Sequence, residues 1–364
     1  MATNLPHKVY VSAQQQQMLD TAKTFGHAGL SNEVLQMERD FSRKVTQSRI
    51  VDQTQYFNHS VMLLCQHNSL LNSILGNTLI EDLKSKKLPP NPRYQIDMNK
   101  RSDGTVACGI YLNYLLDPKG IGLTVPAYET FVEGMIACIE NRRMRGANRN
   151  NFDVDAAATQ WFFDYTKKAV SEIPDMRKSC AANLKTFKQS QKDLIAAAKA
   201  QNATEIRLMG EAGMSTNVHK RCYKHDKLEG SANFFRLARC VLNALWPARG
   251  FTLHSFYCFR AFSVEHVEYG EGIATHLVGG YPAYGGLNYT QAGMQIESAK
   301  KLGHTGWRKM ARENVETREV MEDNLIRMIK RLNGMIEGYQ VRYHIPSASP
   351  RTIVPKLMII ERAS

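Results

Sequence analysis

Arginine and aromatic side chains alternate along a stretch of the chain that contains no Asp or Glu, between Glu229 and Glu265. A guanidinium group pairs with phosphate through parallel hydrogen bonds, and an aromatic ring stacks on a base. The residues of this stretch that we expect to do so are Arg236, Arg239, Arg249 and Phe251. The stretch therefore predicts one wall of a nucleic-acid groove, although the same residues also suit a hydrophobic core with arginines at its rim.

Two further segments concentrate positive charge. The first is ENRRMRGANRNN, residues 140–151, which carries Arg142, Arg143, Arg145 and Arg149. The second is HKRCYKHDK, residues 219–227, in which the residues with contact chemistry are Lys220, Arg221, Tyr223 and Lys224. The cations are suited to phosphate, and Tyr223 with Phe251 to base stacking. The alternative is a solvated, basic surface that binds nothing.

Histidine and cysteine in the second segment raise the question of a metal. Zinc accepts four nitrogen or sulfur ligands. The candidates in this chain are His219, Cys222, His225, His254 and Cys258. The two groups lie far apart in the sequence, no CxxC pair fixes a geometry, and neighbouring lysines repel a cation. We therefore expect no metal and no other cofactor.

Composition narrows the class of protein. The chain has 364 residues and a net charge of +13, from 47 Lys plus Arg against 34 Asp plus Glu. Such a surplus favours a polyanionic partner: nucleic acid, an anionic membrane surface or an acidic protein. Seven cysteines and the absence of a signal-peptide pattern indicate a reducing, cytosol-like compartment. No apolar run approaches eighteen residues, so we expect no integral membrane contact. Known catalytic motifs are absent, so we predict a protein that is not an enzyme.

Hydrophobic spacing predicts a mainly α-helical fold with up to two short strands. The expected helices cover parts of residues 32–82, a buried helix at 125–139 that opens on a proline, and a helix that ends before Pro174. Others are expected at 176–200, at 233–245 before Trp246-Pro247, and at about 308–333. An apolar segment lies at 110–116.

These elements predict four parts of the chain. Residues 1–30 form an N-terminal arm, 31–175 an N-terminal helical lobe, 176–344 a C-terminal helical lobe and 345–364 a C-terminal arm. We expect a positively charged groove between the two lobes, with both arms extended along neighbouring subunits.

The segment NFFRLARCVLNALW, residues 233–246, with the later Arg260-Ala261-Phe262, resembles the core of flexible filamentous plant-virus coat proteins, and the whole chain resembles RNA-virus nucleoproteins. Ser263 stands where such coat proteins usually carry a carboxylate. The resemblance implies a nucleocapsid or coat protein whose lobes clamp single-stranded genomic RNA without sequence preference. It also implies a homo-oligomer joined through the terminal arms, a viral polymerase as a further partner, and location in the virion and the host cytoplasm.

Two other functions are compatible with the same charge. One is a basic, matrix-like scaffold that binds an anionic membrane surface. The other is a zinc-containing nucleic-acid-binding protein that uses the His/Cys residues named above. Association with vesicles in the absence of RNA indicates the first, and bound zinc indicates the second.

Overall fold

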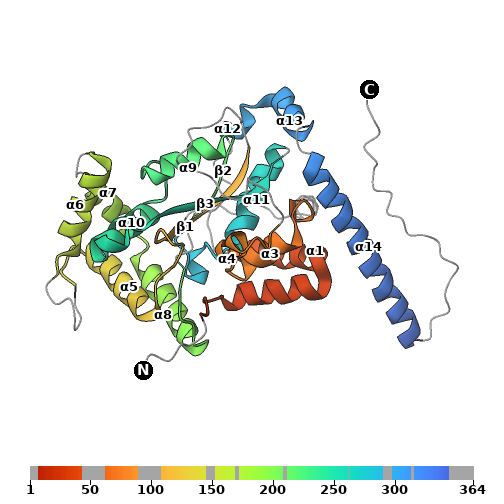
Figure 1. Cartoon of the computed structure of the whole chain (residues 1–364), viewed down its shortest axis with the longest axis horizontal. Coiled ribbons are helices and arrows are strands. Elements are labelled where there is room, and N and C mark those ends of the chain that lie inside the picture. The colour runs from red at the N-terminus through yellow and green to blue at the C-terminus, as the bar shows by residue number, and fades with distance from the viewer. Residues whose placement is uncertain are drawn as a thin grey trace.

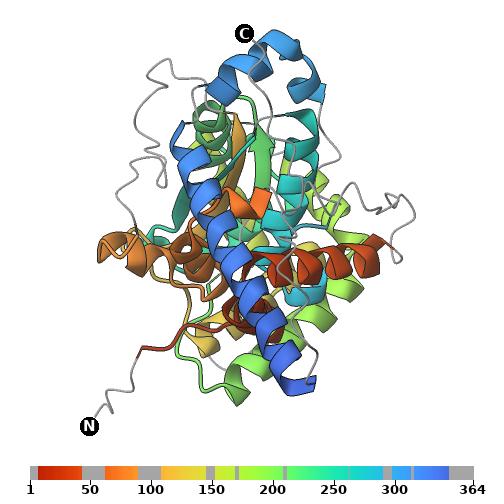
Figure 2. The same cartoon turned by 90° about the vertical axis from the view of Figure 1, so that its right-hand side faces the viewer.

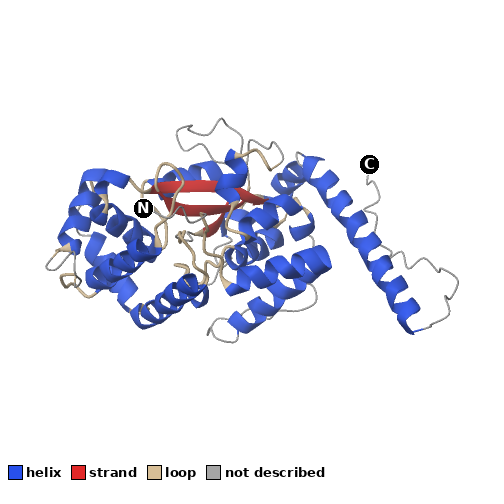
Figure 3. Ribbon diagram, turned by 60° about the horizontal axis from the view of Figure 1, so that its bottom comes forward, coloured by secondary structure: helices blue, strands red, loops and turns tan. Residues whose placement is uncertain are grey.

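The computed structural model describes residues 7–42, 62–88, 108–144, 152–168, 172–207, 211–261, 263–289, 297–312 and 315–343. Within these residues the chain is mainly helical, as predicted, and a small antiparallel sheet lies among the helices (Figures 1 and 3). The predicted Arg145 and Arg149 contacts and the predicted C-terminal arm, 345–364, lie outside the described residues.

Three strands form the sheet, in the order β2-β1-β3. The central strand is β1 (Gly109–Leu116), flanked by β2 (Ala212–Ser215) and β3 (Thr252–Arg260). Tyr114 pairs with His254, and a register shift follows Ile110. Every residue of β1 is buried, so its sequence shows no alternation of polar and apolar residues. The sheet therefore holds three strands within the described residues, where the sequence predicted up to two.

Five helices pack into one hydrophobic cluster, which we call the helical cluster. They are α5 (Val125–Ile139), α6 (Val154–Thr166), α7 (Glu172–Ala181), α8 (Leu184–Ala200) and α10 (Asn233–Leu245). α10 contacts α5, α6 and α7, and its apolar residues are buried as their spacing predicts. The helices occupy the left half of Figure 1. The first half of the acid-free stretch is thus a core helix.

The helical cluster contacts one face of the sheet, and a second hydrophobic cluster, which we call the sheet cluster, covers the other face. It contains α1 (Ala13–Ser42), α3 (Asn68–Leu75), α4 (Leu79–Lys84) and α11 (Val264–Leu277). Alternate residues of a strand point to opposite faces. Accordingly Leu112 and Tyr114 belong to the sheet cluster, whereas Leu115 belongs to the helical cluster. Tyr111 packs instead on α9 (Val218–Asp226), which lies against β1 and β3.

Packing crosses the predicted boundary between residues 175 and 176. In the helical cluster α5, from before this boundary, contacts α8 and α10 from after it, and α6 contacts α10. In the sheet cluster α1 contacts α11, more than two hundred residues later. The two hydrophobic clusters are consequently assembled from interleaved segments rather than from two consecutive ones.

The described part of the predicted N-terminal arm packs on its own chain. Tyr10 donates its backbone N–H to the Glu205 carbonyl at 2.8 Å, and Met18 and Leu30 are buried in the sheet cluster. From residue 7 onward, the described residues therefore contribute to the hydrophobic core of their own chain, which differs from the expected extended arm. Apolar side chains on α1 gain more from burial here than from exposure along an arm.

Two predicted helices are each divided in the structure. The helix expected at 176–200 is α7 plus α8, and α7 accommodates Pro174 in its first turn, where no backbone donor is needed. The helix expected at 308–333 is α13 (Gly303–Arg312) followed by α14 (Val315–Tyr343). α12 (Glu297–Lys300) precedes them. α14 runs along the edge of the molecule on the side of α1 (Figures 1 and 2).

Candidate nucleic-acid interface

The basic segment 219–227 forms α9, and two of its lysines face solvent. The Asn217 side chain caps the helix by accepting from the Lys220 backbone N–H at 2.9 Å. Lys220 and Lys224 are exposed, lie one helical turn apart and have no carboxylate partner among the described residues. Tyr223, between them in sequence, is half-buried. These three predicted contact residues are therefore available to a ligand.

Aromatic rings from α6 meet the C-terminal end of α9. Trp161 and Tyr165 lie one turn apart and stack in parallel, with ring centroids 5.0 Å apart. The Tyr165 hydroxyl donates to the Asp226 carbonyl at 3.0 Å. The Lys227 ammonium lies 5.5 Å from the Tyr165 ring and 5.7 Å from the Tyr223 ring. We call Trp161, Tyr165, Tyr223 and Lys227 the aromatic face.

Sequence reasoning did not select Trp161, Tyr165 or Lys227 as contact residues. The sequence places Trp161 and Tyr165 on the helix expected to end before Pro174, and in the structure both rings are half-buried. Two aromatic residues at positions i and i+4 of a helix were the available signal. Their proximity to α9 could not be foreseen, because it depends on the packing of α6 against α10.

The guanidinium of Arg239 is buried under the aromatic face and contacts two of its rings. Its guanidinium carbon lies 4.7 Å from the Tyr165 ring and 5.8 Å from the Trp161 ring. It donates to the Asp226 carbonyl at 2.6 Å and approaches the Asp226 carboxylate at 3.2 Å. Since Arg239 is 2% exposed, it orients the rings and cannot reach a phosphate in this conformation. That placement corrects its predicted role as a phosphate contact.

Arg236 and Arg249, the other two predicted phosphate contacts of the acid-free stretch, also meet carboxylates from elsewhere in the chain. Arg236 forms an ion pair with Glu172 at the start of α7. Arg249 donates to Asp117 at 3.0 Å and to the Gly122 carbonyl at 2.8 Å. The fold thus supplies acidic partners that the local sequence lacks.

Phe251 is a core residue. It is 2% exposed and packs within the helical cluster, with the Arg249 guanidinium carbon 4.7 Å from its ring. A buried ring cannot stack on a base, so its predicted stacking role does not fit this structure.

The first basic segment lies apart from α9. Arg142 is held by Glu133 at 2.8 Å and Glu140 at 2.7 Å, and the hydrogen bond to Glu133 raises its pKa. Arg143 is exposed. The backbone N–H of Met144 donates to the Phe152 carbonyl, which places this segment at the start of α6, whereas α9 meets the end of α6. A helix of that length separates them by about 20 Å.

Arg221 points inward, toward a buried polar network. It donates to the Gly230 carbonyl at 2.9 Å and interacts with Tyr111 and Glu211. The Tyr111 hydroxyl lies 2.7 Å from His225 Nε2. Burial raises the pKa of Glu211 to about 7 and lowers the pKa of His225 to about 3. Arg221 is therefore a partner of this network rather than an exposed cation.

The candidate zinc ligands do not converge. His225 uses its second ring nitrogen, Nδ1, to bond Ser231, so both nitrogens are engaged. His254 Nε2 bonds the Asp117 carbonyl at 2.9 Å, and Cys258 packs in the sheet cluster. No group of His, Cys, Asp or Glu residues suited to a metal occurs among the described residues.

Comparisons of the chain with protein-family models, with curated proteins and with solved structures yield no match. Among the described helices, none combines the length and hydrophobicity required to cross a lipid bilayer. The geometry of the interface is accordingly the basis on which a function can be proposed.

Proposed function

We propose that the protein is a viral nucleocapsid or coat protein that oligomerises and encapsidates single-stranded RNA through phosphate contacts that do not depend on sequence. The observation that carries this proposal is the position of the exposed Lys220 and Lys224 beside the aromatic face. Cations that follow the backbone and rings that accept any base are the combination by which proteins bind single strands without sequence preference.

The position of α9 agrees with a path for RNA between the two clusters. Figure 1 shows α9 beside the sheet, between the helices of the helical cluster and α11 to α13. In this proposal Lys220 and Lys224 form one wall of the expected positively charged groove. Arg143, some distance away at the start of α6, extends the basic path along the same cluster.

An exposed apolar stripe on α14 supports the oligomeric part of the proposal. Apolar side chains that are 37–51% exposed recur at every third residue, at Ile326, Ile329, Leu332 and Met335. Acidic residues, Glu319, Glu322 and Asp323, come before this stripe, and basic residues, Arg327, Lys330 and Arg331, lie within it. An antiparallel α14 from a second copy would place acidic residues opposite basic ones and cover the stripe. The second copy is thus the occupant that the charges favour.

Binding of labelled single-stranded RNA tests the proposal. Two oligonucleotides of unrelated sequence should bind with the same affinity, and that affinity should fall at least tenfold between about 50 mM and about 200 mM salt, because released counterions drive binding. Equal affinity at both salt concentrations would overturn the proposal. A parallel measurement of binding to anionic vesicles distinguishes this proposal from the membrane-scaffold alternative, which predicts that the protein binds vesicles in preference to RNA.

A further inference from the structure

A carboxylate lies beneath α9, on the side of the helix that faces the sheet. The inner face of α9 carries Cys222 and His225, which are buried, whereas its outer face carries the exposed Lys220 and Lys224. Glu211, immediately before β2, approaches the inner face: its Oε2 lies 3.5 Å from His225 Nδ1, and its side chain is 15% exposed. The helix therefore separates this carboxylate from the lysines to which the proposed function assigns RNA.

The Glu211 carboxylate has few groups that stabilise a negative charge. It accepts from the Ser231 hydroxyl and from the main chain of Ala232. Its Oε2, however, is buried without a hydrogen-bond partner among the described residues. A buried carboxylate that is incompletely hydrogen-bonded favours its protonated form. Burial accordingly raises the pKa of Glu211 to about 7.

The neighbouring groups do not cancel the charge of Glu211 when it ionises. Among the described residues, the cation that acts on it is Arg221, which also interacts with Glu271 of α11. His225 is neutral, because burial and the charge of Arg221 lower its pKa to about 3. The other titratable groups around Glu211 are protonated and uncharged at neutral pH, because burial raises their pKa: the Tyr111 hydroxyl of β1 and the Cys222 thiol of α9.

From this arrangement we propose that Glu211 makes RNA binding at α9 dependent on pH, and that the protonated carboxyl group is the state that binds RNA more tightly. When Glu211 loses its proton, a negative charge appears across the helix from Lys220 and Lys224 and repels the phosphates that these lysines attract. Binding and protonation are reciprocally linked, so bound RNA in turn favours the protonated carboxyl group. The inference rests on the proposed function, because it concerns the regulation of the same surface.

The expected size of the effect follows from the width of α9. A helix with its side chains is about 10–12 Å across. One charge about 12 Å from a phosphate changes RNA affinity by about two- to tenfold, for effective dielectric constants from about 80 to about 20. With a pKa of about 7, Glu211 is about 10% ionised at pH 6 and about 90% ionised at pH 8. RNA affinity should therefore fall by this factor as the pH rises from 6 to 8.

Binding of a labelled single-stranded oligonucleotide at constant salt concentration, measured from pH 6 to pH 8, tests the proposal. The unmodified protein should lose affinity by about two- to tenfold over this range. Glu211→Gln keeps the shape of the side chain and cannot ionise, so it should retain the higher affinity throughout. Constant affinity of the unmodified protein over this range would overturn the proposal, as would an unchanged pH dependence in Glu211→Gln.

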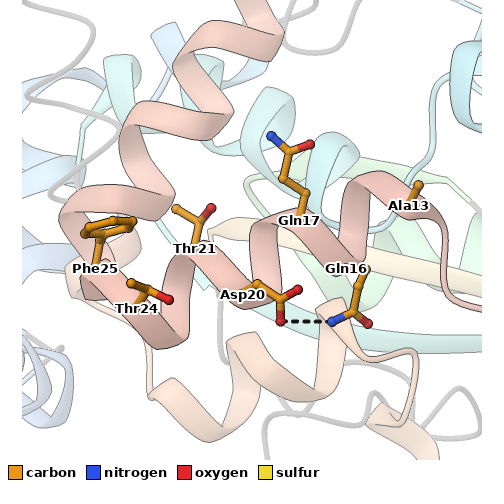
Figure 4. A pocket seen from close by; sticks show the side chains of 7 residues that line it. All are labelled: Ala13, Gln16, Gln17, Asp20, Thr21, Thr24 and Phe25. Atoms are coloured by element: carbon orange, nitrogen blue, oxygen red, sulfur yellow. Dashed lines mark hydrogen bonds between the residues drawn. The ribbon is translucent and has the colours of Figure 1, made fainter.

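Asp20 on α1 provides a matched control (Figure 4). It lines a hollow of about 490 Å³ at the surface, is 60% exposed, and accepts from the Gln16 side chain at 2.9 Å. α1 lies low in Figure 1 where α9 lies high. Asp20→Asn, which also replaces a carboxylate by an amide, should therefore leave the pH dependence of RNA binding unchanged.

Histidine is the other side chain that commonly changes its charge in this pH range, and His219 lies on α9. The variant His219→Gln should retain the fall in RNA affinity between pH 6 and pH 8. If His219→Gln abolishes the pH dependence and Glu211→Gln does not, the histidine governs it and the proposal is wrong.

Calorimetry of the unmodified protein gives a readout that needs no substitution at a buried site. RNA binding near pH 7 should take up a fraction of a proton, so the measured enthalpy should differ between two buffers of different ionisation enthalpy. Equal enthalpies in the two buffers would contradict the proposal. RNA binding without pH dependence overturns this inference alone, whereas failure to bind RNA at any pH contradicts the proposed function and the inference with it.

Discussion

Replacement of both Lys220 and Lys224 by alanine should reduce the salt dependence of RNA binding. The two lysines lie one turn apart on α9, so a single strand that follows this face contacts both. Neither has a carboxylate partner among the described residues, so their removal exposes no opposing charge. The double substitution should therefore change binding without a large change in stability, within about 0.5 kcal/mol for exposed positions.

The size of the effect follows from the phosphates that the two lysines neutralise, one for each ammonium group. Each neutralised phosphate of a single strand contributes about 0.7 to the slope of log affinity against log salt concentration, so the pair contributes about 1.4. Over a fourfold rise in salt concentration, the ratio of the RNA affinity of the unmodified protein to that of the double variant should fall by about sevenfold. Fluorescence anisotropy with a labelled oligonucleotide at several salt concentrations measures both slopes.

Lys185 and Lys192 provide the matched control. Both are exposed on α8, which lies low in Figures 1 and 2 where α9 lies high, and their replacement removes the same net charge. The slope for this control should equal that of the unmodified protein. If the two double variants reduce the slope equally, overall charge and not the α9 surface governs binding, and the reasoning is refuted.

Two further predictions concern stability. Arg239→Ala should lower the free energy of unfolding by about 3 kcal/mol, because Asp226 loses its buried cation. As a control, Lys224→Ala on the surface should change the free energy of unfolding by no more than about 0.5 kcal/mol. Urea denaturation measures both values. The pKa of Glu211 is about 7 in the folded protein, above its ordinary value of 4.5, so this residue lowers stability as pH rises from 5 to 8. Glu211→Gln should therefore gain about 2 kcal/mol relative to the unmodified protein over that range, and no relative gain would show that Glu211 is ionised throughout.

The helices with local signals were predictable from the sequence. The buried helix α5 begins and ends at the predicted residues, Val125 and Ile139, with Thr124 as its cap and Pro126 in its first turn. α10 ends at Leu245, immediately before the predicted Trp246-Pro247 terminator. In both helices, the apolar spacing and the signals at the ends predict the same boundaries, and packing in the core stabilises the same helix.

The sheet and the electrostatics of the interface depend on distant residues. β3 pairs with β1, which lies well over a hundred residues earlier, and burial of both strands hides the alternation that would reveal them. Likewise, Arg236 finds its carboxylate partner 64 residues away. The absence of acidic residues from one stretch of sequence therefore does not predict free arginines in the fold. Of the predicted cations that the structure describes, the exposed ones are Lys220, Lys224 and Arg143.

The central claim, that this protein encapsidates RNA, is tested most directly by what accompanies it during purification. The unmodified protein, expressed without any added nucleic-acid ligand and treated with ribonuclease, should retain protected RNA that absorbs at 260 nm. Negative-stain microscopy of the same sample should show rods or rings, which the Lys220/Lys224 double variant forms less readily. A purified protein that is monomeric and free of nucleic acid before any nuclease treatment would contradict the account.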